Sequence, residues 1–452
     1  MGKKKVVYIF ALVLVFLTFA WCAFRKFSCN ENYLSVLPSD VIALSRIHVD
    51  ELVKAKENSP SLFTTFFLQR FSNKSGIKFS SPLYAFMDAE RRLGVVGAVS
   101  NASTLKSFLT KNHFKIERNN DFNMATWNHL HLVFDDEKFF AIFKLSSSDT
   151  GIEDYMVKSM MQSEQASCAL QSAIDTLDGQ FTLVAHANAL PQSMTDLMEV
   201  ILPKDTHPKD ITITSSLSLH EKKIRLEGKI SSDKTEINKL LDRIDNTFRP
   251  VGKYVSFDAI NPSIASIIHL NVEGKEFLQF ARSIPDVRLA LLALNMCIDA
   301  DMMISSVNGP VSIYNAKESS GTGNMILSAS LENTDFLRNI DDWDDNMTSG
   351  TIGYEKLSDK EFRIEAFEKN FWFSIQNQSL HLASPNRINT LAGLAVSAQN
   401  SNGKETQNIM VMQVKLDAVK EMLIPPLQDY LKQDKTILLQ FSDSRHFNIQ
   451  MQ

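Results

Sequence analysis

Four runs of alternating hydrophobic and polar residues recur along the chain, and each passes into a segment with the periodicity of a helix. The runs cover 41–49, 181–188, 264–272 and 409–417. Alternation with a period of two predicts a half-buried β-strand, and apolar positions spaced by three and four residues predict an amphipathic helix. Further strand-like runs follow, so the pattern predicts a repeated strand–helix–strand–strand unit.

Two of these units end in a pattern typical of a β-hairpin. Residues 211–219 and 222–230 are strand-like runs with only two polar residues between them, and the runs 436–443 and 446–452 repeat the arrangement. Short polar connections between strand-like runs favour antiparallel pairing. We therefore expect largely antiparallel sheets that carry helices on one face.

The first and third units match over longer stretches in the order of their elements, although not in their residues. Residues 76–88 parallel 297–315, residues 93–109 parallel 324–340, and residues 129–143 parallel 370–384. The sequence therefore predicts an α+β fold in two related halves, 37–250 and 251–452. Pro250 and Gly252 mark the predicted boundary, because these residue types interrupt regular structure.

A continuous apolar segment without a charged residue covers 6–24. As a helix this segment is about 28 Å long, close to the roughly 30 Å of a bilayer core. Three lysines precede the segment and two basic residues follow it, so the positive-inside rule places residues 1–5 in the cytoplasm. We predict a single-pass transmembrane anchor in a bacterial inner membrane, a tether over 25–36, and a main body in the periplasm.

The N-terminal segment has two alternative interpretations. A cleaved signal peptide could use Ala20 and Cys22 as its −3 and −1 residues, and the protein would then be secreted. Acylation at Cys22 or Cys29 would instead give an outer-membrane lipoprotein, although the residues before each cysteine suit this poorly.

The other two cysteines, Cys168 and Cys297, lie in apolar, helix-like sequence. Two states are compatible with this pattern: both are buried free thiols, or they form a disulfide with each other.

Composition narrows the classes of function. With 452 residues, 44% hydrophobic and 22% charged, the chain has the composition of a globular protein of two or more domains. Its net charge of −5 indicates no basic surface for nucleic acid. It has only 16 glycines and no glycine-rich phosphate-binding motif. We therefore predict no nucleic-acid partner and no cofactor.

One short motif typical of catalysis occurs without its partner. Asp149-Thr150-Gly151 is the tripeptide of aspartic proteases, which need two such loops, and no second copy is present. The tripeptide is better explained as the N-terminal cap of a helix within 151–177. We favour core packing over an adaptable binding groove for a methionine-rich stripe of that helix, which consists of Met156, Met160, Met161, Cys168 and Leu170.

The remaining candidate motifs are also incomplete. His129 and His131 share one face of a predicted strand, as two metal ligands could, but no third ligand is placed beside them. The acidic run 341–345 lacks the central glycine and the closing glutamate of a calcium loop. Ser-x-x-Lys, the motif of a serine–lysine nucleophile, occurs at the scattered pairs Ser75–Lys78, Ser103–Lys106 and Ser231–Lys234.

Scattered Ser-x-x-Lys copies are expected by chance, and we interpret the serines of the last two pairs as helix N-caps. The sequence therefore assigns no catalytic, cofactor-binding or metal-binding residue.

The order of several segments resembles a family of Gram-negative envelope proteins that is known only as an uncharacterised domain of unknown function. The resemblance rests on LPSDVIALSRIHVDELV (37–53), GIKFSSPLYAFMD (76–88), RLGVVGAVSNASTLKSFL (92–109) and INPSIASIIHLNVEGKEFLQF (260–280). It implies an exported protein that is membrane-anchored or a lipoprotein. It implies no activity and no site residues.

Three functions are compatible with these observations. The first is a non-enzymatic binding or scaffold module that is anchored in the membrane and meets a protein or lipid partner. The second is a carrier of a lipid or other hydrophobic ligand between sheet and helices, which the 30 phenylalanines and 17 methionines suggest. The third is an unrecognised hydrolase, because folding can bring together a serine, an acid and a histidine that are distant in sequence.

Overall fold

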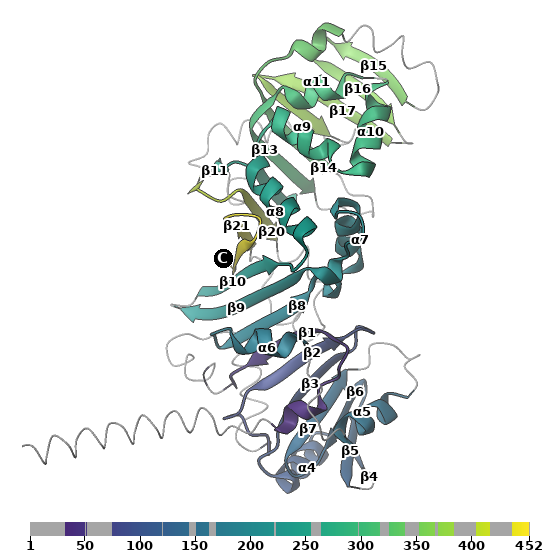
Figure 1. Ribbon diagram of the computed structural model, residues 1–452, viewed down its shortest axis with the longest axis vertical. Helices are drawn as coiled ribbons and strands as arrows, with labels where there is room; N and C mark the ends of the chain where they lie inside the picture. The colour runs from purple at the N-terminus through teal and green to yellow at the C-terminus, as the bar shows by residue number, and fades with distance from the viewer. Residues whose placement is uncertain are drawn as a thin grey trace, which may run out of the picture. The chain divides into compact units, whose positions relative to one another are not determined.

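Strands and helices combine in a mixed α+β fold with antiparallel sheets, which confirms the predicted class at this level (Figure 1). The computed structural model describes residues 32–49, 51, 75–119, 121–143, 151–161, 169–220, 223–254, 264–296, 298–316, 325–339, 352–366, 369–383, 404–415 and 436–451. The predicted anchor, 6–24, lies outside these residues. Among the helices that are described, none is long and apolar enough to cross a membrane.

Contacts divide the chain into two compact units. Unit 1 comprises Met1–Glu57 and Phe63–Thr182, and unit 2 comprises Asn58–Leu62 and Leu183–Gln452. The main division therefore falls after Thr182, whereas the sequence placed the boundary of its related halves at residue 250. The predicted halves are defined by a repeated order of elements and not by the contacts that define the two units. The division into units therefore does not test the halves, and they stay a prediction.

The described part of unit 1 is built on an antiparallel sheet with the strand order β1–β2–β3–β7–β6–β5–β4. The first predicted strand, 41–49, is confirmed as β1. The elements are η1 (Asn32–Val36), β1 (Val41–Ile47), β2 (Leu83–Asp88), β3 (Leu93–Ala98), α4 (Ala102–Lys111), β4 (Lys115–Asn119), β5 (Phe122–Trp127), β6 (Leu130–Phe134), β7 (Lys138–Phe143), α5 (Ile152–Met161) and α6 (Ala169–Asp175).

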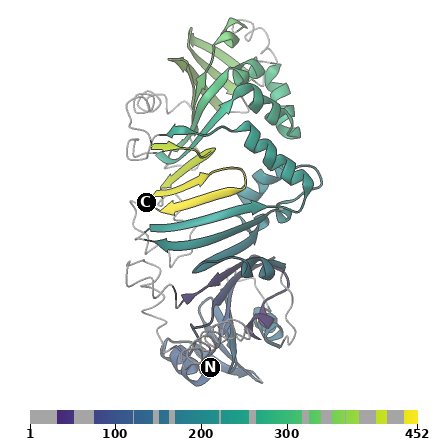
Figure 2. The ribbon, with the colours of Figure 1, turned by 60° about the vertical axis from the view of Figure 1, so that its left-hand side comes forward.

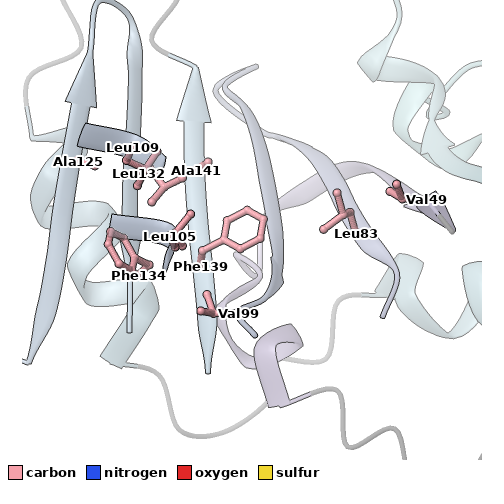
Figure 3. Close-up of a cluster of buried hydrophobic side chains, with 10 residues drawn as sticks. All are labelled: Val49, Leu83, Val99, Leu105, Leu109, Ala125, Leu132, Phe134, Phe139 and Ala141. Atoms are coloured by element: carbon pink, nitrogen blue, oxygen red, sulfur yellow. The ribbon is translucent and has the colours of Figure 1, made fainter. Parts of the chain in front are cut away.

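Helix α4 supplies part of the core of unit 1 (Figure 3). The helix begins after Asn101, whose side chain accepts a hydrogen bond from the backbone N–H of Thr104 at 2.8 Å. Leu105 and Leu109 are one turn apart, so they share a face. Both are buried in one cluster with Phe134 of β6, which fixes the helix on the sheet.

The described part of unit 2 is built on a longer antiparallel sheet, in which β22 lies beside β10 (Figure 2). The strand order is β9–β10–β22–β21–β20–β12–β13–β14–β18–β17–β16–β15. These strands are β9 (Thr212–His220), β10 (Lys223–Ser231), β12 (Ile264–Glu273), β13 (Val307–Ala316), β14 (Met325–Leu331), β15 (Ile352–Ser358), β16 (Glu361–Ala366), β17 (Lys369–Gln376), β18 (Ser379–Ala383), β20 (Met410–Lys415), β21 (Thr436–Phe441) and β22 (His446–Met451).

Three further strands lie outside this order. β11 (Gly252–Tyr254) and β19 (Lys404–Thr406) pair with each other, and β8 (Phe181–His186) spans the division between the units. The predicted hairpins are confirmed, because β9 pairs with β10 and β21 pairs with β22 in antiparallel register. The parallel segments 129–143 and 370–384 also contain antiparallel hairpins, formed by β6 with β7 and by β17 with β18.

The helices of unit 2 pack in one layer. A buried cluster contains Leu240 of α8 and Phe280 of α9, and Ile201 of α7 and Val287 of α10 pack against it. The layer also packs on the sheet. Ala300 of α11 and the preceding Ile298 belong to one buried cluster with Phe362 of β16 and Phe373 of β17. The elements are η3 (Ala187–Ala189), α7 (Gln192–Ile201), η4 (Pro208–Asp210), α8 (Thr235–Thr247), α9 (Gly274–Arg282), α10 (Pro285–Asn295), α11 (Ala300–Ser305) and η6 (Asp335–Asn339).

Gly274, the first residue of α9, allows this helix to approach α11 closely. A Cβ atom at Gly274 would overlap the carbonyl oxygen of Ile304 and would lie 2.7 Å from the carbonyl oxygen of Val307. Both are backbone atoms, which cannot rotate away as a flexible side chain can. The position therefore requires glycine for steric reasons.

Candidate functional site

The two candidate histidines lie on different elements. His129 lies in the turn that follows Asn128, which has a left-handed backbone (φ 50°), so the predicted strand begins one residue later than expected. His129 is exposed, and His131 lies on β6 with its Nδ1 3.8 Å from Oε1 of Glu153. Among the described residues, no group of three His, Cys, Asp or Glu side chains could hold a metal ion.

The first two Ser-x-x-Lys pairs have structural roles in unit 1. Ser75 is fully buried, and its Oγ accepts a hydrogen bond from the backbone N–H of Ile77 at 3.2 Å, whereas Lys78 is exposed. The predicted N-cap Ser103 is wrong. Asn101 caps α4 instead, because its backbone is extended and its side chain reaches forward to the N–H of Thr104 in the first turn.

The N-cap predicted at Ser231 is also wrong. Ser231 is the last residue of β10, and Lys234 occupies the N-cap position of α8. The neighbouring Ser232 takes the capping role in part, since its Oγ accepts a hydrogen bond from the backbone N–H of Lys234 at 3.1 Å. The strand continues further than expected because Ser231 still pairs with Thr212 of β9.

Several predictions fall on residues that the structure does not describe. They concern Asp149 and Thr150, the acidic run 341–345, Cys168 and Cys297. The helix predicted within 151–177 is present at both ends of that range as α5 and α6. Met156 and Met160 of α5 and Leu170 of α6 are buried, which confirms core packing for these residues. The prediction is wrong for Met161, the last residue of α5, which is 57% exposed.

A serine–histidine pair lies on neighbouring strands of unit 2. His269 of β12 and Ser312 of β13 are directly opposite in the register, and Nδ1 of His269 lies 2.9 Å from Oγ of Ser312. Such a pair is the minimum of a nucleophile and its base. However, His269 is only 3% exposed and its ring packs on Tyr254, 5.6 Å between centroids. We interpret the pair as a buried, hydrogen-bonded network of the sheet.

The same row of the sheet continues through further polar residues. Ser312 is opposite Ser328 of β14, Ser328 is opposite His381 of β18, and His381 is opposite Ser374 of β17. His381 is buried, and this desolvation lowers its pKa. Sequence reasoning missed this row because its members come from separate strands that only the long-range register brings together.

His381 should make the folding of unit 2 sensitive to acid. Because the pKa of His381 is lowered in the folded state, the unfolded chain binds this proton more tightly than the folded chain does. The free energy of unfolding is therefore unaffected by His381 above the ordinary histidine pKa of about 6.5, and it decreases as the pH drops below that value. We expect the melting temperature to decrease between neutral and mildly acidic pH. Differential scanning calorimetry of wild type and His381→Gln checks this, because an equal decrease in both proteins would contradict it.

Helix α10 carries an exposed apolar face. From Leu289 to Met296 its only polar residue is Asn295. Leu289, Leu292 and Met296 are 62%, 58% and 77% exposed, and their spacing places them along one face, which we call the α10 ridge. The opposite face is buried through Leu291. A surface helix normally has polar residues on its solvent face, so the α10 ridge is a candidate contact surface.

Helix α7 carries a second exposed apolar face. Met194, Leu197 and Val200 are exposed and follow one another at three-residue spacing, and we call them the α7 ridge. The acidic residues Asp196 and Glu199 of the same helix are also exposed. The other side of α7 packs on α8. Both ridges therefore belong to the helical layer of unit 2.

A buried ion pair holds α5 to the sheet of unit 1. The fully buried carboxylate of Asp88, at the end of β2, accepts hydrogen bonds from the backbone N–H groups of Glu90 and Arg92 at 3.0 and 2.9 Å. It also accepts one from Nε of Arg92 at 2.6 Å. The hydroxyl of Tyr155 donates to the same carboxylate at 3.3 Å, and the Arg92 guanidinium lies 4.1 Å from the centre of the Tyr155 ring.

Burial, followed by the charge of Asp88, raises the pKa of Tyr155, so this phenol acts as a neutral donor. The hydrogen-bonding groups of the cluster satisfy one another, which indicates a structural role.

Comparisons with known proteins identify no family. No protein-family model matches the sequence, and no curated protein matches it. The chain is similar to three crystal forms of TP0453, forms IV, III and I, at 12%, 11% and 12% identity with TM-scores of 0.31, 0.31 and 0.30. These matches cover 47%, 51% and 51% of this chain and 85%, 92% and 90% of TP0453. Similarity at this level carries no functional argument.

Proposed function

We propose that the protein is a non-enzymatic binding or scaffold module of a bacterial envelope, which meets its partner through the exposed apolar face of α10. The observation that supports this function is the exposure of Leu289, Leu292 and Met296 on a helix that is also apolar where it is packed. Apolar surface of this kind is stabilised when another molecule covers it. The α7 ridge adds a second contact in the same helical layer.

The strength of such a contact can be bounded. Full burial of a leucine or methionine side chain contributes about 1.5–3 kcal/mol. The three residues of the α10 ridge are already partly covered, so together they would contribute about 3–6 kcal/mol, whereas a micromolar complex needs about 8 kcal/mol. The partner must therefore touch further surface, or it must be held close by a tether.

The proposed location supplies such a tether. The apolar segment 6–24 would anchor the chain in the inner membrane and place its bulk in the periplasm. The resemblance of 37–53 and 260–280 to Gram-negative envelope proteins supports the same location. Two alternatives remain, a carrier of a hydrophobic ligand and a hydrolase. Among the residues that the structure describes, the buried pair of His269 and Ser312 is the arrangement that we would test for hydrolase activity.

The repeated architecture belongs to this proposal. The order β1–β2–β3–β7–β6–β5–β4 has a counterpart in β12–β13–β14–β18–β17–β16–β15, with the same sequence of connections. A hairpin follows each set, β9 with β10 and β21 with β22, and the two hairpins pair through β10 and β22. These correspondences support two related halves, 37–250 and 251–452, that each contribute to one sheet.

Photo-cross-linking in cells tests the proposed contact surface. With a photoreactive amino acid in place of Leu292, we expect about five-fold more cross-linked product than with the same probe in place of Lys239, because a covered apolar residue stays next to its partner. Lys239 is an exposed polar position on α8 of the same unit. Mass spectrometry of the products checks the result, and equal yields at the two positions would contradict the proposal.

A further inference from the structure

The two apolar ridges of unit 2 belong to one packed body. Ile201 of α7 and Val287 of α10 both pack against the buried cluster that contains Leu240 of α8 and Phe280 of α9 (Figure 1). Each helix exposes the face opposite to its packed side, and that face carries the α7 ridge on one helix and the α10 ridge on the other. The same body therefore presents two separate apolar strips to solvent.

The charges beside the two ridges are complementary. Asp196 and Glu199 are exposed along one flank of the α7 ridge, and α7 contains no basic residue. Arg288 is exposed along one flank of the α10 ridge and forms no ion pair with any residue that the structure describes. Opposite charges on facing surfaces steer association and fix its register, whereas two α7 ridges would bring carboxylates together. The α7 ridge therefore suits the α10 ridge better than a second α7 ridge.

The acidic residue of α10 does not oppose this pairing. With 3.6 residues per turn, Asp286 and Arg288 lie about 160° apart around the helix, on opposite flanks of the α10 ridge. When Arg288 faces Asp196 and Glu199, Asp286 faces the other flank of the α7 ridge. That flank carries Met198 and no charged residue, so no pair of like charges is formed.

We propose that two copies of the chain associate through the helical layer of unit 2, with the α7 ridge of each copy on the α10 ridge of the other. This inference rests on the proposed function, because it names the partner of the same surface. Every contact of a twofold dimer occurs twice, so this interface covers four ridges, whereas one α10 ridge provides too little apolar surface for a micromolar complex. Each copy contributes Met194 and Met296, and methionine is enriched at protein interfaces.

Photo-cross-linking between differently tagged copies tests this inference. Two full-length forms with different affinity tags are produced in the same cells, and one of them carries a benzophenone amino acid in place of Leu292. We expect about five-fold more product that contains both tags than with the same probe in place of Lys239, because only position 292 would face the second copy. Mass spectrometry should place the link within 192–201 of that copy. A yield equal to the control, or a link outside α7, would overturn the inference.

A charge-reversal cycle tests the pairing of the two ridges. Arg288→Glu should weaken the dimer about ten-fold, because like charges then face each other across the contact. Adding Asp196→Arg and Glu199→Arg should restore the affinity to within about three-fold of wild type, which a merely structural role of Arg288 would not allow. The matched control is Lys275→Glu, an exposed position of α9 outside both ridges, which should leave the dimer unchanged.

Sedimentation equilibrium of the full-length variants in mild detergent measures these affinities, and circular dichroism confirms that each variant is folded. Failure of the two arginines to restore the dimer would overturn the inference. An equal loss of affinity in Arg288→Glu and Lys275→Glu would overturn it as well, because the effect would then depend on net charge and not on the flank of the α10 ridge.

The two proposals can fail separately. If the probe at 292 gives cross-links to a different protein and none to the second copy, the dimer is overturned and the binding surface is retained. If the probe at 292 gives no more product of either kind than the probe at 239, both the inference and the proposed function are overturned. A product that joins position 292 to α7 of a second copy supports both.

Discussion

Asp88→Ala should destabilise unit 1 by about 3 kcal/mol, since removing one partner of a buried ion pair leaves the other charge without compensation. Asp88 is fully buried, and the side chain of its partner Arg92 is only 14% exposed. The substitution also leaves the backbone N–H groups of Glu90 and Arg92 and the hydroxyl of Tyr155 without their acceptor. Urea titration followed by hydrogen exchange of peptides from β2 and β3 measures the loss.

Glu90→Ala is the matched control for this prediction. Glu90 pairs with the same guanidinium, Oε2 to Nη1 of Arg92 at 3.1 Å, but its side chain is 67% exposed. Exposed pairs contribute about 0–1 kcal/mol, so the control should change the stability of unit 1 little. Similar losses in the two variants would show that burial of Asp88 does not decide the strength of the interaction.

Gly274→Ala should destabilise unit 2 by about 2 kcal/mol, although alanine is the better helix former. In an open helix this substitution would stabilise the fold by up to about 1 kcal/mol. Here the added Cβ overlaps the carbonyl oxygen of Ile304, and overpacking against atoms that cannot move costs about 1–3 kcal/mol. We expect the steric term to dominate, so that α9 shifts away from α11 and the exchange of its amide protons accelerates.

Lys275→Ala tests whether the effect belongs to the site or to the helix in general. Lys275 is the next residue of α9 and is exposed. Lysine and alanine differ little in helix propensity, so this variant should unfold at nearly the wild-type urea concentration. If Gly274→Ala also unfolded at nearly the wild-type urea concentration, there would be room for a Cβ atom between α9 and α11, and the predicted steric overlap would be wrong.

Local patterns carried most of what the sequence predicted of the fold. The alternating runs at 41–49 and 264–272 correspond to β1 and β12, because alternation reports directly on a strand with one buried face. The hairpin of β21 and β22 was predictable for the same reason. Helix caps were not, since Asn101 and Ser103 are both good capping residues and only the backbone conformation distinguishes them.

The candidate surface could be predicted only in part. The sequence shows that α10 is apolar from Leu289 to Leu294, and by itself such a run indicates a buried helix. Exposure of Leu289 and Leu292 depends on which face meets α9, which is a property of the tertiary packing. The polar row through His269 and His381 depends even more on distant contacts, because its register is set across several strands.

The pairing of β10 with β22 has a consequence for the newly made chain. More than 200 residues separate these neighbouring strands. At about 5–20 residues per second, β10 waits roughly ten seconds or longer for its partner to leave the ribosome. During this time one edge of β10 is unpaired, and an unpaired strand edge readily recruits other chains. Production of this protein should therefore depend on a chaperone that shields the waiting strand until translation is complete.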